Sequence, residues 1–66
     1  MFIRLTREYE GGVQEPIYIN IHHVSTYSPN ATGHHTVIWL HSHTHSILVK
    51  ESIEEVTKMI NAILRK

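Results

Sequence analysis

The junction between an apolar run and a helix start, at residues 47–56, constrains the fold of this chain most strongly. Residues 47–49 are Ile, Leu and Val, which is typical of a short buried strand. Ser52 and Glu55 have the spacing of a capping box, in which each side chain accepts a hydrogen bond from the other residue's amide. The sequence therefore predicts a last strand followed almost at once by a capped helix.

This helix is expected over residues 53–65. Glu54 and Lys58 are four residues apart in the favourable order, and Arg65 and Lys66 lie near the end, where basic residues suit the helix dipole. One face is apolar and the opposite face is polar, as in a helix that packs on a sheet. The apolar stripe consists of Ile53, Val56, Ile60, Ile63 and Leu64.

Alternation of apolar and polar residues predicts four or five strands before the helix. The clearest alternation is at residues 17–22, and Gly11-Gly12 is typical of a turn. No helix is expected between the strands, so an antiparallel meander is predicted. The fold class is thus α+β, with an antiparallel four- to five-stranded sheet and one C-terminal helix packed on one face. The expected strands are residues 2–9, 16–22, 24–27, 36–41 and 47–49.

The chain length predicts a single domain, residues 1–66. Such a short chain buries only about 60% of its unfolded surface, so small folds usually add a disulfide, a metal or a partner subunit. The chain has no cysteine, which excludes disulfides and thiolate zinc sites. The core expected beneath the helix consists of Ile3, Leu5, Ile17, Ile19, Ile21, Ile38, Leu40, Ile47 and Val49.

A second set of apolar side chains alternates with this core and should point to the other face of the sheet. Monomers seldom expose a large contiguous apolar patch, so we expect another subunit to cover it. The prediction is a non-enzymatic interaction module that forms a homo-oligomer and contacts an unidentified protein. Trp39 is its expected anchor, since Trp is enriched in interface hot spots. The predicted interface consists of Phe2, Tyr18, Val37, Trp39 and Leu48.

Seven histidines raise the question of a metal site. His41, His43 and His45 alternate, and on a strand such positions share a face about 6.6 Å apart, near enough for two imidazoles to meet one zinc ion. The other interpretation is a polar, solvent-facing segment that uses histidine without a metal. A third interpretation is a pH switch, because clustered imidazoles become charged together below about pH 6. No cofactor is expected, with zinc as the one alternative.

Charge and composition argue against several classes. The formal net charge is zero at pH 7, whereas proteins that hold phosphate backbones are usually basic. The chain has no aspartate, no cysteine and no Gly-rich phosphate loop, so it is not expected to be an enzyme. No segment approaches the ~18 apolar residues of a membrane span, and no signal peptide is recognised. A cytoplasmic protein is therefore expected.

Four segments carry a resemblance to the small bacterial flagellar and swarming-motility proteins of the FlbD type. They are Leu5-Thr6-Arg7, Ile17-Tyr18-Ile19-Asn20, Thr36-Val37-Ile38 and, most strongly, residues 47–56. That family has a short Asn-Gly hairpin where this chain has residues 41–46. The resemblance implies no catalytic residues. It implies an accessory protein of motility or regulation that acts through contacts, of bacterial, phage or mobile-element origin.

The chain also resembles the carbon-storage-regulator RNA-binding dimers. The likeness lies in the Leu5-Thr6-Arg7 opening, the expected strands and the single C-terminal helix. It implies that Arg4, Arg7 and Lys50 could grip RNA. Against this, the net charge is zero and Glu51 follows Lys50, where a basic patch would be wanted. RNA binding therefore stays an alternative to protein–protein interaction.

Overall fold

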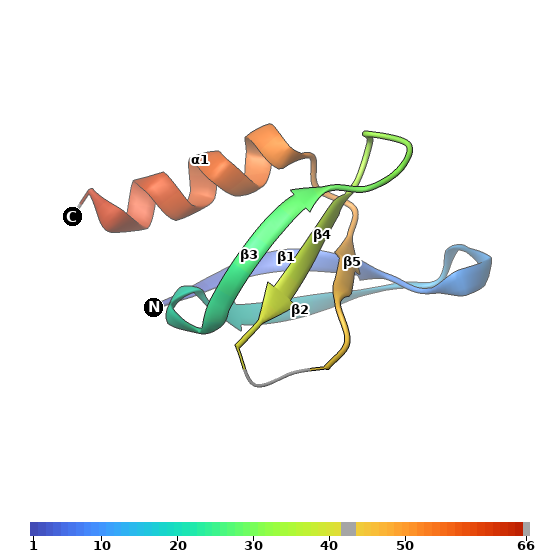
Figure 1. Cartoon of the computed structure of the whole chain (residues 1–66), viewed down its shortest axis with the longest axis horizontal. Helices are drawn as coiled ribbons and strands as arrows, with labels where there is room; N and C mark the ends of the chain where they lie inside the picture. The colour runs from blue at the N-terminus through green and yellow to red at the C-terminus, as the bar shows by residue number, and fades with distance from the viewer. Residues whose placement is uncertain (42–43, 66) are drawn as a thin grey trace.

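The computed structural model describes residues 1–41 and 44–65 of the chain. It contains a five-stranded antiparallel sheet followed by one helix, so the predicted α+β fold class is confirmed (Figure 1). Two 3₁₀ turns, η1 and η2, flank the second strand. The elements are β1 (Phe2–Glu8), η1 (Glu10–Gly12), β2 (Gln14–Asn20), η2 (Ile21–His23), β3 (Val24–Pro29), β4 (Thr36–Leu40), β5 (Ile47–Val49) and α1 (Ile53–Leu64).

The strand order is β2-β1-β5-β4-β3, which corrects the expectation of a continuous meander. β1 and β2 form one hairpin, β3, β4 and β5 form a meander, and the two parts pair only where Arg7 lies opposite Val49. β2 and β3 are consecutive in sequence but lie at the two edges of the sheet. Between them, the Asn20 side chain accepts a hydrogen bond from the His22 amide and starts η2. This turn ends β2 at Asn20 and leads the chain to the far edge.

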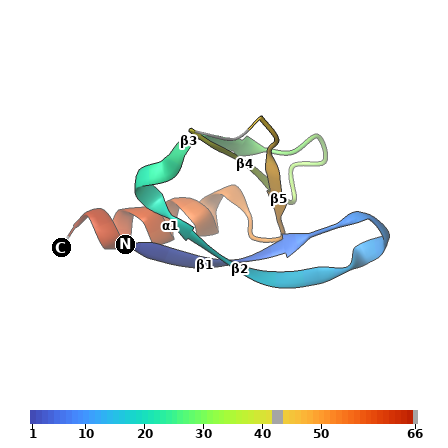
Figure 2. The same cartoon turned by 90° about the horizontal axis from the view of Figure 1, so that it is seen from below.

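The β1–β2 hairpin and the β3–β4–β5 part diverge from their junction as two layers, and α1 lies between them (Figure 2). The core fills the space that they enclose. Val56 of α1 is fully buried, and the Tyr27 hydroxyl lies 3.2 Å from the Thr57 hydroxyl, within hydrogen-bond distance. The buried apolar residues are Ile3, Leu5, Ile19, Ile21, Ile38, Ile47, Val49 and Val56.

The structure also corrects the predicted core at four residues. Leu64, expected in the helix stripe, is 63% exposed, because the last turn of α1 extends past the strands (Figure 1). Met59 packs against the core, although the stripe did not include it. Ile17 and Leu40 are only partly buried, since the two layers separate beside them.

The start of α1 is capped as predicted. The Ser52 side chain accepts from the Glu55 amide at 3.2 Å, and the Glu55 carboxylate accepts from the Ser52 amide at 3.2 Å. α1 has 12 residues, well short of the roughly 20 needed to span a bilayer. Among residues 1–41 and 44–65, no helix is long and apolar enough to cross a membrane.

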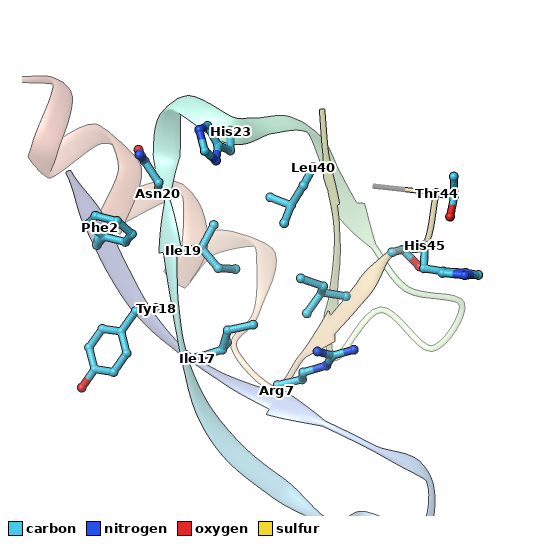
Figure 3. Close-up of a pocket in the computed structure, with 12 residues that line it drawn as sticks. Phe2, Arg7, Ile17, Tyr18, Ile19, Asn20, His23, Leu40, Thr44 and His45 are labelled. Atoms are coloured by element: carbon cyan, nitrogen blue, oxygen red, sulfur yellow. The ribbon is translucent and has the colours of Figure 1, made fainter. Parts of the chain in front are cut away.

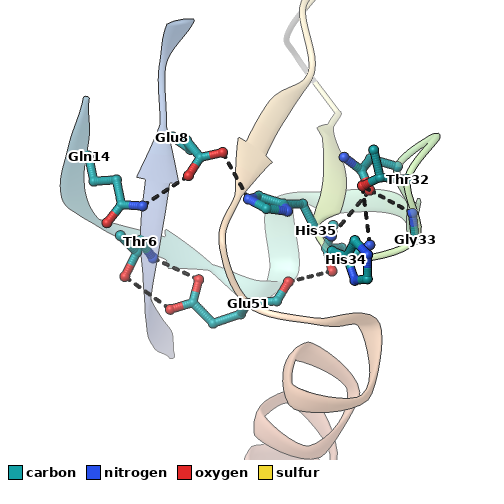
Figure 4. A network of polar contacts seen from close by, with 10 residues as sticks. Thr6, Glu8, Gln14, Thr32, Gly33, His34, His35 and Glu51 are labelled. Atoms are coloured by element: carbon teal, nitrogen blue, oxygen red, sulfur yellow. Dashed lines mark hydrogen bonds and ion pairs between the residues drawn. The ribbon is translucent and has the colours of Figure 1, made fainter. Parts of the chain in front are cut away.

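Glu51, between β5 and α1, connects the two layers of the sheet (Figure 4). Its carboxylate accepts from the Thr6 amide at 2.9 Å and from the Thr6 hydroxyl at 3.1 Å. Its carbonyl accepts from the hydroxyl of Thr36, which is fully buried, at 2.8 Å. Beside it, the Lys50 amide donates to the Thr6 carbonyl at 2.8 Å. The Glu51 side chain therefore extends the β1–β5 contact beyond the single backbone pair at Arg7 and Val49.

Candidate functional site

A groove of about 650 Å³ opens where the two layers separate (Figure 3). Ile17 and Ile19 of β2 form one wall, and Leu40 and Ile47 of β4 and β5 form the other. These four side chains belong to the set that faces the core, so the floor of the groove is apolar core surface. The volume lies within the roughly 300–1,000 Å³ typical of ligand pockets.

The rim of the groove is polar and carries no carboxylate. Arg7 follows Ile3 and Leu5 on the inward face of β1, because alternate residues of a strand share a face. Its guanidinium carbon lies 4.7 Å from the centre of the Tyr9 ring, a cation–π distance. The other polar lining residues are Asn20, His23, Thr44, His45 and Ser46. The groove can thus accept apolar side chains together with a negatively charged group.

The five predicted interface residues fall into two groups. Phe2 and Tyr18 are 61% and 64% exposed and lie beside the groove, but Tyr18 is paired with Arg4 on the outer face of the β1–β2 hairpin, and its ring points away from the groove (Figure 3). Val37 and Leu48 pair across β4 and β5 on the outer face of the other layer, beside Trp39, which is 42% exposed. The single patch expected from the sequence is therefore divided between the two layers.

An arm, residues 8–15, projects beyond the rest of the molecule (Figures 1 and 2). The β1–β2 pairing continues into it up to Glu8 opposite Gln14, and the Tyr9 amide donates to the Val13 carbonyl at 2.8 Å. Gly11 and Gly12 at its tip have φ of 77° and 79°, a conformation that glycine adopts without strain. Tyr9 and Val13 are 40% and 60% exposed, so the arm presents apolar side chains to solvent.

The base of the arm is tied to the loop that precedes β4 (Figure 4). Glu8 accepts from Gln14 Nε2 at 2.9 Å and contacts His35 Nε2 at 2.8 Å. His35 Nδ1 is buried without a partner among the described residues, which fits an imidazole whose Nε2 carries the proton and donates to Glu8. The Asn30 side chain accepts from the Gly33 and His35 amides and orders the loop. These contacts hold the arm in one orientation.

Within the arm, the Tyr9 hydroxyl donates a hydrogen bond to the Glu15 carboxylate. This bond and the negative charge of Glu15 raise the pKa of Tyr9 above its ordinary value of 10.0, against an opposing effect of Arg7. A pKa that is raised in the folded state stabilises the fold below the unfolded pKa. That contribution is lost as the pH rises through the folded pKa of Tyr9.

We expect Glu15→Gln to lower the pKa of Tyr9, because the amide carries no charge and is a weaker acceptor. The pKa can be followed through the Tyr9 ring carbon resonance in an NMR titration above pH 9. Glu10→Gln is the matched control, since no side-chain hydrogen bond joins Glu10 to the Tyr9 hydroxyl in the described residues. An unchanged Tyr9 titration in Glu15→Gln would contradict the assignment of this hydrogen bond as the cause.

The predicted histidine metal site is not assembled in the described residues. His41 and His45 are exposed at the two ends of the β4–β5 connection, and His43 lies outside the described residues. Across residues 1–41 and 44–65, no three His, Cys, Asp or Glu side chains gather to hold a metal ion. The described residues therefore provide no geometric support for the zinc hypothesis.

The predicted RNA-binding residues are not on one surface. Arg4 and Lys50 are exposed. Arg7 lines the groove instead, because it lies three positions from Arg4 in a strand and so faces the opposite way. The three residues do not form a continuous basic strip.

Sequence reasoning missed the groove, although one signal was present. Ile3 and Leu5 establish the inward face of β1, and Arg7 is the next residue on that face. A cation at an inward position of a strand indicates either a buried partner or an opening in the core. No carboxylate of the described residues forms an ion pair with Arg7, and the groove supplies the opening.

Comparison of the chain with protein-family models, with curated proteins and with solved structures gave no match. The resemblances to the FlbD-type proteins and to the carbon-storage regulators therefore stay predictions from the sequence.

Proposed function

We propose that this protein is a non-enzymatic interaction module that self-associates, and that the groove is its contact surface. The observation that carries the proposal is the apolar floor of the groove. Ile17 and Leu40 lie at the opening of the core, yet no segment of the described chain covers them. Apolar area removed from water contributes about 25 cal/mol per Å². A partner that fills the groove would bury this apolar surface and so stabilise the complex.

The small size of the chain supports the same proposal. Only eight apolar residues are buried in the described chain, and domains of this size often rely on a partner subunit. Phe2 and Tyr18 add exposed aromatic surface to the β1–β2 hairpin next to the groove, and aromatic residues are enriched at interfaces. An accessory role in motility or regulation, which the FlbD-type resemblance implies, requires contacts of this kind and no catalysis.

Two serine substitutions allow the groove to be tested against the outer face of the sheet. We expect Ile17→Ser to weaken self-association at least about tenfold, as loss of an interface hot spot does, because the partly buried Ile17 side chain points into the groove (Figure 3). Trp39→Ser is the matched control and should leave association within about twofold. Sedimentation equilibrium gives both association constants, and circular dichroism confirms that each variant is folded.

The opposite pattern, with only Trp39→Ser dissociating the protein, would place the contact on the outer face of β3, β4 and β5. It would contradict the groove as the contact surface and support Trp39 as the anchor predicted from the sequence. A wild-type protein that is monomeric at every concentration would contradict self-association itself.

A further inference from the structure

We infer that the groove of each subunit receives the arm of a second copy of this chain, so that two copies exchange arms in a symmetric dimer. This inference rests on the proposed self-association and names the segment that makes the contact. The arm, residues 8–15, is the projecting part of the molecule (Figure 2), and the groove is its concave apolar surface (Figure 3).

The charges of the two surfaces are complementary. The arm carries Glu8, Glu10 and Glu15 and contains no lysine or arginine. The groove is lined by one cation, Arg7, and by no carboxylate. Arg7 is half-buried and lies over the Tyr9 ring of its own chain, but no ion pair to it is present among the described residues, so its charge is available to a carboxylate from another molecule. Complementary potentials of this kind fix the partner and the register of an interface.

The apolar surfaces match as well. The arm exposes Tyr9 and Val13 near its tip, and the groove exposes parts of Ile17 and Leu40 in its two walls. Insertion of the arm would remove both sets from water at once. The arm is also held rigid by the Tyr9–Val13 backbone bond and the Glu8–His35 contact, so little conformational entropy is lost when it binds.

The arm that fills the groove must come from another molecule. In each chain the β1–β2 pairing runs without a break from Phe2 opposite Asn20 to Glu8 opposite Gln14. The arm is therefore a straight extension of the same strands that form one wall of the groove, and it cannot fold back onto that wall. A two-fold axis makes both contacts identical and leaves neither an arm nor a groove unfilled.

Charge reversal on each surface tests the inference. The groove variant is Arg7→Glu, and the arm variant is Glu10→Lys with Glu15→Lys. In a dimer of either variant alone, both arm–groove contacts bring like charges together, so we expect association at least about tenfold weaker than wild type by sedimentation equilibrium. Glu54→Lys, which reverses an exposed charge on α1, is the control and should associate like wild type.

An equimolar mixture of the two variants is the decisive sample. In the mixed dimer one contact joins the wild-type arm to the wild-type groove, and the other joins a lysine arm to a glutamate groove. Both contacts are favourable, so dimers should reappear at close to the wild-type affinity. A C2 interface on any other surface would not be restored by this particular mixture.

The outcomes separate the inference from the proposed function. If wild type self-associates but the charge reversals have no effect, or the folded variants fail to associate when mixed, arm exchange is wrong and self-association stands. If wild type is monomeric, both are wrong. If Arg7→Glu does not fold, because Arg7 contacts the Tyr9 ring, His45→Glu on the exposed side of the same groove replaces it and carries the same expectation.

Discussion

Replacing Glu51 with alanine is expected to destabilise the fold by about 2 kcal/mol, since hydrogen bonds to charged groups are worth about 1.5–3 kcal/mol. The Glu51 carboxylate accepts from both the amide and the hydroxyl of Thr6, and the alanine variant leaves that amide without an acceptor. In a domain of this size the change corresponds to a melting temperature lower by about 8–16 °C. Thermal unfolding followed by circular dichroism measures it.

Two further variants sharpen this prediction. Glu54→Ala removes an acid of the same type that is exposed in the first turn of α1, and it should cost less than about 1 kcal/mol, the range of helix-dipole effects. Glu51→Gln keeps one oxygen acceptor and should fall between the two alanine variants. Equal melting temperatures for Glu51→Ala and Glu54→Ala would show that Glu51 does not hold the two layers together.

Leu5→Ala is expected to destabilise the fold by about 2–5 kcal/mol, the range for large-to-small changes in a core. Leu5 is 0% exposed and lies on the inward face of β1, so truncation leaves a cavity at the centre of the sheet. The whole domain is worth only about 3–10 kcal/mol at about 0.05–0.15 kcal/mol per residue. Urea unfolding at a fixed protein concentration should therefore show a large fall in the midpoint.

Leu64→Ala is the matched control, because it is the same substitution at a leucine that is 63% exposed. It should change the free energy of unfolding by less than about 0.5 kcal/mol, as surface substitutions usually do. The two variants also test whether Leu64 belongs to the core, as helical periodicity predicted, or is exposed, as in the structure. Comparable losses in the two variants would mean that the last turn of α1 is buried.

Local patterns predicted the elements of this fold well because their causes are local. The alternation of isoleucines at residues 17–21 follows the two-residue repeat of a strand, and the Ser52–Glu55 spacing follows the geometry of one helical turn. Both features need only neighbouring residues. Leu64 was misplaced for a related reason, since helical spacing defines a face but not where the sheet beneath it ends.

The strand order could not be predicted in the same way. Sequence proximity favours pairing of β2 with β3, whereas β1 pairs with β5 across more than forty residues. That long-range contact depends on Glu51, whose carboxylate bonds Thr6, and on Thr36, whose hydroxyl bonds the Glu51 carbonyl. Polar contacts between distant residues leave no periodic signal in a single sequence.

The candidate site was predicted only in part for the same reason. Phe2 and Tyr18 were correctly placed outside the core by alternation, and they border the groove. The groove itself arises from the divergence of the two layers, which is a property of the whole sheet. The arm was recognised only as a turn at Gly11 and Gly12, because its projection depends on how far the β1–β2 pairing extends.

The molar mass of the wild-type protein in solution tests the proposed self-association most directly. Light scattering in the presence of a chelator at neutral pH, from micromolar to millimolar protein, excludes metal-bridged association. A mass of twice the 7.7 kDa chain, approached as the concentration rises, is the predicted result. A constant mass of 7.7 kDa over the whole range would contradict the proposal that the groove is filled by a second copy.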